Sequence, residues 1–173
     1  MIDLRSRIRD IPDFPKPGIV FRDITPLLAD GPAFRSMIDA FVERYRGKAD
    51  VVLGIESRGF IIGAAVAYGL GTGLVVVRKP GKLPWRTHVA RYDLEYGSDA
   101  LEIHHDAIAD GHRVLIIDDL LATGGTASAA VELVRRCGGR VVGCAFAIEL
   151  EFLQGRRRLP DYEVFSLVQY DRP

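Results

Sequence analysis

Residues 114–126 read VLIIDDLLATGGT, and this stretch decides the fold class. It begins with four aliphatic residues, Val114 to Ile117, which have the length and branching of a strand buried on both faces, as in a parallel sheet. After the loop, ASAAVELVRR at 127–136 has helical spacing. The loop is therefore expected where a strand ends and a helix begins, which is where open α/β sheets bind ligands and where free amides favour an anion.

The loop itself has the chemistry of a site for a phosphorylated sugar. Two adjacent acids can accept hydrogen bonds from sugar hydroxyls or reach a bound Mg²⁺. The glycines let the backbone approach a phosphate, and the threonines add hydroxyl groups. An ordinary strand-to-helix turn with acidic caps is the plainer alternative. The candidate residues are Asp118, Asp119, Ala122, Thr123, Gly124, Gly125 and Thr126.

A second loop of the same kind lies in GIESRGF, residues 54–60. Glu56, Ser57 and Arg58 follow an apolar strand pattern and precede an apolar helical pattern, so amides and a guanidinium would meet an anion there. This arrangement suits a diphosphate. The alternatives are a helix cap by Ser57 and a surface ion pair by Arg58. The motifs GxSxG and GxxxxGK[ST] are absent, which disfavours a serine hydrolase and a P-loop.

Composition favours one compact catalytic domain over residues 1–173. The chain is 48% hydrophobic, and its 23 Lys and Arg balance 23 Asp and Glu, which argues against nucleic acid or a membrane as the main partner. Cys137 and Cys144 lack metal-ligand spacing, and the amino-terminal residues lack the apolar core of a signal peptide. We therefore expect a reduced, cytoplasmic protein without a membrane span.

The chain alternates between strand and helix patterns, which predicts an α/β fold with a central, mostly parallel sheet of about five strands flanked by helices. Helical spacing occurs at 4–11, 33–45, 60–68 and 127–136, and strand patterns occur at 51–55, 74–78, 114–117, 141–148 and 164–168. Gly69, Gly71 and Gly73 indicate a helix end and a turn. Between residues 79 and 110 the order breaks into Gly-, Pro- and aromatic-rich stretches around an alternating piece at 101–104. This pattern predicts an inserted lid that is either a β-rich flap or a mobile loop.

Several stretches resemble a known family. The two acids before ATGGT resemble the 5-phosphoribosyl-1-diphosphate (PRPP) motif of type I phosphoribosyltransferases. FPKPGIVFRDITPLL at 14–28, RKPGKLP at 78–84, LEYG at 94–97 and FSLVQY at 165–170 are similar to adenine phosphoribosyltransferases. The resemblance implies a type I phosphoribosyltransferase-like fold and the Mg²⁺-dependent conversion of adenine and PRPP to AMP and diphosphate, a reaction of purine salvage.

The resemblance also divides the chain. It implies a base-binding hood segment at 1–30, a lid at 79–110 and a PRPP-binding strand, loop and helix at 114–137. It further implies a homodimer, and Mg²⁺ held mainly through PRPP rather than in a dedicated protein cage, with Asp118 and Asp119 as candidate ligands.

Base recognition is assigned by the same resemblance. The carbonyl of Val20 and the amide of Arg22 would pair with the amino group and a ring nitrogen of adenine, while Phe21 and Leu120 sandwich the ring. Proline fixes the backbone of the preceding FPKPG, so a rigid edge would read the base. A 6-oxo purine would leave its polar groups unpaired and would be rejected.

Diphosphate binding and catalysis complete the implied roles. The lid carries Glu95, the candidate general acid or base at purine N7, with Tyr96 beside it; a solvated loop carboxylate is the alternative for Glu95. The diphosphate loop of the family often carries a non-proline cis peptide, which would fall at Glu56–Ser57. The diphosphate-binding candidates are Glu56, Ser57, Arg58, Arg78, Lys79 and Lys82, and the catalytic candidates are Glu95, Arg58, Asp118 and Asp119.

Three other functions share parts of this pattern. A hypoxanthine/guanine, xanthine or orotate phosphoribosyltransferase would keep the PRPP loop, but FPKPGIVFRDITP argues against a different base pocket. A non-catalytic PRPP-sensing regulator that binds nucleic acid would need a basic excess or a helix-turn-helix extension, which the sequence lacks. A nucleotide-binding scaffold without turnover is the third alternative.

Overall fold

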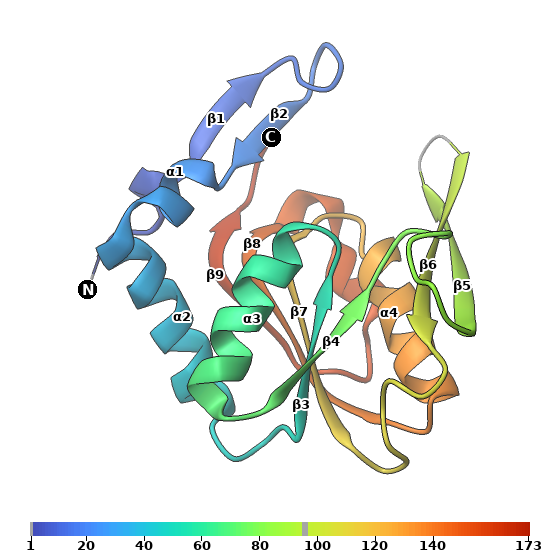
Figure 1. Cartoon of the computed structure of the whole chain (residues 1–173). Coiled ribbons are helices and arrows are strands. Elements are labelled where there is room, and N and C mark those ends of the chain that lie inside the picture. Colours follow the sequence, from blue (N-terminus) through green and yellow to red (C-terminus); the bar gives the residue numbers. More distant parts are fainter. Residues whose placement is uncertain (1, 95–96) are drawn as a thin grey trace.

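The computed structural model of the chain describes residues 2–94 and 97–173. Its central sheet has five parallel strands in the order β4-β3-β7-β8-β9 (Figure 1). These strands are β3 (Val51–Ile55), β4 (Gly73–Val77), β7 (Arg113–Leu121), β8 (Arg140–Leu150) and β9 (Val164–Tyr170). The predicted α/β fold and its parallel sheet are confirmed.

Helices cover both faces of this sheet (Figure 1). The first face carries α1 (Thr25–Ala29), α2 (Gly31–Tyr45) and α3 (Arg58–Leu70), and the second carries α4 (Gly125–Arg136). Leu115 and Ile117 of β7 pack in the core of the first face, whereas Val114 and Ile116 pack in the core that includes α4. Both faces of β7 are therefore buried, which explains why the run VLII has no polar position.

Local signals set the ends of the first-face helices. The side chain of Asp30 accepts a hydrogen bond of 3.0 Å from the amide of Ala33 and caps α2. Helix α3 ends at Leu70, and Gly71 adopts the left-handed conformation, with φ of 70°, that ends many helices. The predicted helices at 33–45, 60–68 and 127–136 are all present.

The predicted helix at 4–11 is wrong. The structure has a three-residue 3₁₀ turn, η1 (Arg5–Arg7), followed by β1 (Arg9–Pro12), which pairs in antiparallel fashion with β2 (Val20–Asp23). Leu4, Ile8 and Ile11 have helical spacing, but so short a segment does not form a stable helix alone, and pairing with β2 prevails. We call residues 2–30, with η1, β1, β2 and α1, the hood.

The segment between β4 and β7 forms an antiparallel hairpin of β5 (Thr87–Leu94) and β6 (Gly97–His104). Ala90, Leu101 and Ile103 are buried in the core that includes α4, so the hairpin is joined to the body. The predicted β-rich insert is confirmed, although β6 is longer than predicted and β5 was missed. In Figure 1 the hood and the hairpin both project at the end of the sheet where β3 stops and α3 begins.

Strands β8 and β9 are joined by two 3₁₀ turns, η2 (Glu151–Leu153) and η3 (Gly155–Arg158), rather than by an α-helix. In the described part of the chain, no helix has both the length and the apolar character needed to cross a membrane.

Candidate active site

A cavity of about 310 Å³ lies at the carboxyl edge of the sheet, between the loops that follow β3 and β7. Most of its lining consists of predicted site residues: Glu56, Ser57, Arg58, Lys79, Asp118, Asp119, Leu120, Ala122, Thr123, Gly124, Gly125 and Thr126. Tyr92, Leu101, Leu121, Ala127 and Phe146 complete it. The structure therefore brings the two predicted anion-binding loops together around one space.

Asp118 and Asp119 lie near the end of β7, with only 8% and 6% of their surface exposed. Asp118 Oδ1 accepts a hydrogen bond of 2.9 Å from the amide of Asp119. Burial, and then the neighbouring Asp119, raise the pKa of Asp118 well above its ordinary value, although Arg58 opposes this. Burial therefore disfavours the anionic form of Asp118.

Arg58 is the first residue of α3, and its Nε forms an ion pair with Asp119 Oδ2. Its guanidinium also lies 5.8 Å from the ring centroid of Phe21 in the hood. Burial alone would lower the pKa of Arg58. The nearby carboxylates outweigh this effect, so the pKa is raised overall; they are Asp119, Asp118 and Asp23. Arg58 is therefore a permanent cation that links the acids of β7 to the hood.

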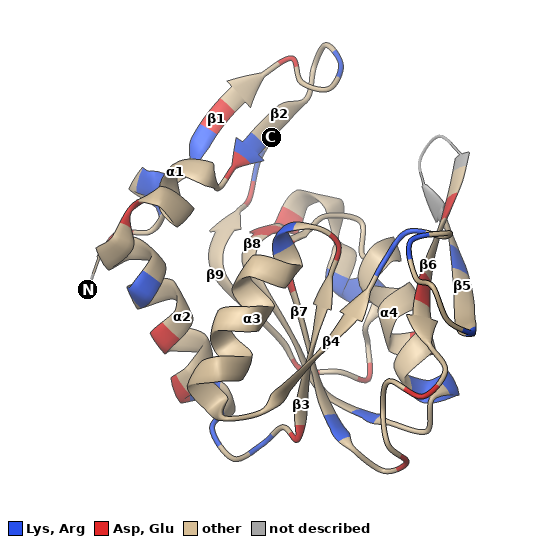
Figure 2. Cartoon of the chain, in the orientation of Figure 1, with Lys and Arg blue, Asp and Glu red and all other residues tan. Residues whose placement is uncertain are grey.

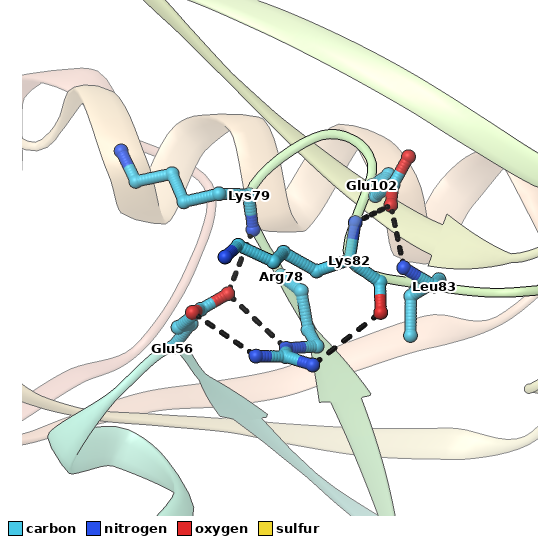
Figure 3. Close-up of polar contacts among 6 residues, drawn as sticks. All are labelled: Glu56, Arg78, Lys79, Lys82, Leu83 and Glu102. Atoms are coloured by element: carbon cyan, nitrogen blue, oxygen red, sulfur yellow. Dashed lines mark hydrogen bonds and ion pairs between the residues drawn. The ribbon is translucent and has the colours of Figure 1, made fainter.

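Glu56 organises the loop that follows β4 (Figure 3). Its two carboxylate oxygens accept hydrogen bonds of 3.2 Å each from Nε and Nη2 of Arg78, and Oε2 accepts one of 2.9 Å from the amide of Lys79. Burial raises the pKa of Glu56, but these donors lower it by more, and the net shift is downward. Glu56 and Arg78 are thus engaged with each other, and a direct contact of either with diphosphate stays a prediction.

Glu102 of β6 holds the other end of the same loop (Figure 3). Its Oε1 accepts hydrogen bonds of 3.1 and 3.0 Å from the amides of Lys82 and Leu83. Arg78 Nη1 is 3.4 Å from the carbonyl of Lys82, which closes the loop on itself. In Figure 2 the ribbon is blue, for Lys or Arg, at the start of α3 and along this loop. Glu102 was not among the predicted site residues; it holds the loop in shape and does not line the cavity.

Lys79 points its amine toward the hairpin. Its Nζ forms an ion pair with Asp99 and lies 3.3 Å from the hydroxyl of Tyr92. Tyr92 and Asp99 face each other across β5 and β6, and their side chains are joined by a hydrogen bond of 3.2 Å. Neither was predicted, because their pairing depends on the register of a hairpin whose first strand the sequence pattern does not indicate.

The loop after β7 ends in a glycine turn at the start of α4. Gly124 has a φ of 83°, a left-handed conformation, and stands at the cap of α4. The first amides of α4 have no partner within the helix and are available to an anion in the cavity. The start of α3, which follows the loop of residues 56–58, packs closely against β7. A Cβ atom added at Gly59 would be 2.8 Å from the carbonyl oxygen of Ile117.

The base-binding candidates come from two places. Leu120 lines the cavity, whereas Val20, Phe21 and Arg22 lie on β2 of the hood. The Arg22 side chain is engaged elsewhere. It pairs with Asp10 at 2.5 Å, and its guanidinium lies 4.1 Å from the ring centroid of Tyr170. The roles proposed for the backbone of Val20 and Arg22 stay predictions.

The remaining expectations concern two lid residues, a cis peptide bond and the metal site. Glu95 and Tyr96 lie outside the described residues. The peptide bond between Glu56 and Ser57 is cis, as the resemblance implied. Within residues 2–94 and 97–173, no group of three or more His, Cys, Asp or Glu could hold a metal ion. Two carboxylates, at Asp118 and Asp119, fit an Mg²⁺ ion that takes most of its oxygen ligands from a substrate.

Comparisons with known proteins show the family of the chain. The model of the phosphoribosyl transferase domain matches residues 28–171. Adenine phosphoribosyltransferases of Syntrophotalea carbinolica and Geobacter metallireducens are each 61% identical over 171 residues, which cover 98% of this chain and 100% of each relative.

Solved structures give the same result. An adenine phosphoribosyltransferase from Thermoanaerobacter pseudethanolicus superposes with a TM-score of 0.94 at 50% identity, covering 96% of this chain and 98% of that one. The Saccharomyces cerevisiae enzyme, in complex with an imino-altritol bisphosphate and adenine, has a TM-score of 0.91 at 43% identity, covering 95% and 96%. The chain therefore belongs to the phosphoribosyl transferase domain family and, within it, to the adenine phosphoribosyltransferases.

Proposed function

We propose that this protein transfers the phosphoribosyl group of PRPP to adenine and releases AMP and diphosphate. The observation that carries the proposal is the cavity at the carboxyl edge, where the loop of residues 118–126 meets residues 56–58 in a chain 61% identical to adenine phosphoribosyltransferases. Two anion-binding loops around one space suit a substrate with a phosphate at one end and a diphosphate at the other.

The loop after β7 takes the phosphoribosyl end. The free amides at the start of α4 and the hydroxyls of Thr123 and Thr126 bind the 5′-phosphate. Asp118 and Asp119 accept hydrogen bonds from the ribose hydroxyls and favour the positive charge that develops at the sugar as the bond to diphosphate breaks.

The diphosphate lies against Ser57 and Arg58, with the cations of the loop after β4 nearby. Lys79 lines the cavity, while Arg78 and Lys82 belong to the loop that Glu56 and Glu102 hold in shape. Mg²⁺ bound to PRPP, with Asp118 and Asp119 as its protein ligands, would neutralise charge on the leaving group. Arg58 adds a fixed positive charge at the same place.

Adenine enters between Phe21 of the hood and Leu120 of the loop. N9 of the base then displaces diphosphate at C1′ of the ribose, and the carbonyl of Val20 and the amide of Arg22 select the amino purine. Phe21 is already tied to the site by its contact with Arg58, 5.8 Å from ring centroid to guanidinium. Glu95 would exchange a proton with purine N7.

A homodimer is part of this proposal. Ile61 and Tyr68 are seven residues apart and so share one side of α3, where they are 49% and 90% exposed. Large apolar side chains exposed together on one helix favour burial against a partner, and a second copy of the chain is the proposed partner. Light scattering coupled to size exclusion should give twice the mass of the chain, and Tyr68→Glu should shift the protein toward the monomer.

The function is tested by the rate of diphosphate release from PRPP and Mg²⁺ with adenine, hypoxanthine, guanine or orotate. Release with adenine alone supports the assigned base pocket. Release with another base would keep the PRPP site but exclude the roles of Val20 and Arg22. If no diphosphate is released with any of the four bases, the PRPP-sensing regulator becomes the leading function.

A further inference from the structure

The connection between β8 and β9 packs against the loop of residues 118–126, which is proposed to bind the phosphate. In this connection Gly155, the first residue of η3, is buried against the backbone of Ala122 and Gly124 and the side chain of Leu121. A Cβ atom added at Gly155 would lie 2.3 Å from the carbonyl oxygen of Ala122 and 3.1 Å from the amide nitrogen of Gly124. No side chain larger than hydrogen fits there without moving the loop.

The contact is equally close from the other side. A Cβ atom added at Gly124 would lie 2.4 Å from the carbonyl oxygen of Gly155. Gly124 needs to be glycine also for its φ of 83°, and it stands where the free amides of α4 begin. The two backbones therefore meet at the residue that shapes the anion site.

An ion pair between buried Glu149 and the more exposed Arg156 holds Gly155 in place. Glu149, at the end of β8, is only 2% exposed, and its two carboxylate oxygens accept hydrogen bonds of 2.6 and 2.7 Å from Arg156. Arg156 Nη1 also donates a hydrogen bond of 2.9 Å to the carbonyl of Val164, the first residue of β9. The residue next to Gly155 is thus fixed to both strands that flank the connection.

Two further features fix the path of the connection. Gln154, which precedes Gly155, has a φ of 54°, a conformation that non-glycine residues rarely adopt and that here turns the chain toward the loop. Leu159, which follows η3, is buried in the core that includes α4. The turn and the anchor leave η3 little freedom to move away from the loop.

We propose that Gly155 and Arg156 are positioning residues for the 5′-phosphate. Held by Glu149, they fix the backbone of residues 122–124 in the conformation that presents the loop amides to the substrate. The proposal deepens the function proposed above and rests on it, because it assumes that this loop binds the phosphate of PRPP. Neither residue touches the substrate.

The test compares Gly155→Ala and Arg156→Lys with the native protein. The matched control is Arg157→Ala, since Arg157 is exposed and adjacent in the same turn. A displaced loop should raise the KM for PRPP roughly ten- to a hundred-fold in Gly155→Ala, because small misplacements of binding groups cost this much, and by less in Arg156→Lys. The KM for adenine should change little, although the added methyl group in Gly155→Ala should also lower the thermal midpoint by several degrees. Arg157→Ala should behave like the native protein.

Calorimetric binding of ribose 5-phosphate and of inorganic diphosphate with Mg²⁺ separates this proposal from the function. Weaker binding of ribose 5-phosphate by Gly155→Ala, with diphosphate binding unchanged, supports the proposal even if adenine is not the acceptor. An unchanged affinity for ribose 5-phosphate, or an equal loss for both probes, overturns it. If Gly155→Ala fails to fold, Arg156→Lys gives the same comparison.

Discussion

Arg58 of α3 forms an ion pair with Asp119 of β7, although the two residues are 61 positions apart in the sequence. The pair joins the two loops that line the cavity. Because Asp119 is almost fully buried while the Arg58 side chain is 39% exposed, the guanidinium can meet a substrate anion from the open side while its charge still balances the acids. The proposed diphosphate and ribose sites are therefore electrostatically coupled.

Replacing Arg58 by Ala should lower kcat/KM by about 10² to 10³, because it removes a preorganised positive charge from the leaving group. It also leaves Asp119 without this ion pair. The measurement is steady-state kinetics with PRPP varied. Arg113→Ala is the control, since it breaks an Arg–Asp pair of 2.7 Å with Asp50, two side chains outside the cavity lining. Equal losses in the two variants would remove Arg58 from the mechanism.

Asp118→Asn should stabilise the ligand-free protein at neutral pH while reducing turnover. The pKa of Asp118 is raised in the folded state, so the native protein loses stability as pH rises from the ordinary aspartate pKa through the raised one. Asn carries no charge and escapes this loss. For a chain of this size each kcal/mol shifts the thermal midpoint by about 2 to 4 °C. The advantage of the variant should be small near pH 4 and grow toward pH 8.

A difference in thermal midpoint between Asp118→Asn and the native protein that does not change with pH would contradict the raised pKa of Asp118. Glu132→Gln is a suitable comparison, because Glu132 pairs with Arg136 on the exposed surface of α4 and should give little change.

Glu56→Gln should act through the loop that follows β4. The variant loses the charge that holds Arg78 and the amide of Lys79, which should cost about 1 to 2 kcal/mol and raise the KM for PRPP. The pKa of Glu56 is lowered in the folded state, so its stabilising effect is present above the ordinary glutamate pKa and is lost as pH falls through the lowered one. Denaturant unfolding at pH 7 and at pH 3 measures the difference, which should shrink at the lower pH. A KM for PRPP equal to the native value would separate Glu56 from the site.

The position of the hood should depend on Tyr170. Two guanidinium groups lie over its ring, with Arg5 at 4.4 Å and Arg22 at 4.1 Å from the centroid. Tyr170→Leu should therefore cost about 1 to 2 kcal/mol and raise the KM for adenine severalfold, because Arg22 belongs to the proposed base-reading strand. Tyr170→Phe keeps the aromatic face and should stay close to native in both measurements. If the two variants behave alike, the cation–ring stack does not position the hood.

Much of the fold could be predicted because its signals are local. Buried parallel strands appear as aliphatic runs, as at 51–55 and 114–117, and the acids and glycines after the second run mark the end of the strand. The helix predicted at 4–11 failed because spacing alone does not show that Ile11 pairs with Phe21 across a hairpin. Strand β5 was missed because its mixed sequence, THVARYDL, lacks a clean alternation.

The site was predicted less completely for a physical reason. Residues such as Asp118 and Arg58 stand at strand and helix ends and could be identified from the sequence. Glu102 and Arg156 act through backbone groups or buried partners that only the folded chain brings near. Local patterns carry no information on such long-range contacts.

The proposed function requires that one cavity joins adenine to the phosphoribosyl group of PRPP. The most direct measurement is the ratio of products formed from adenine, PRPP and Mg²⁺ by the native protein, with AMP and diphosphate quantified in the same sample by chromatography. Equal amounts of AMP and diphosphate, both dependent on adenine, are expected. Diphosphate without AMP, or neither product, would contradict it.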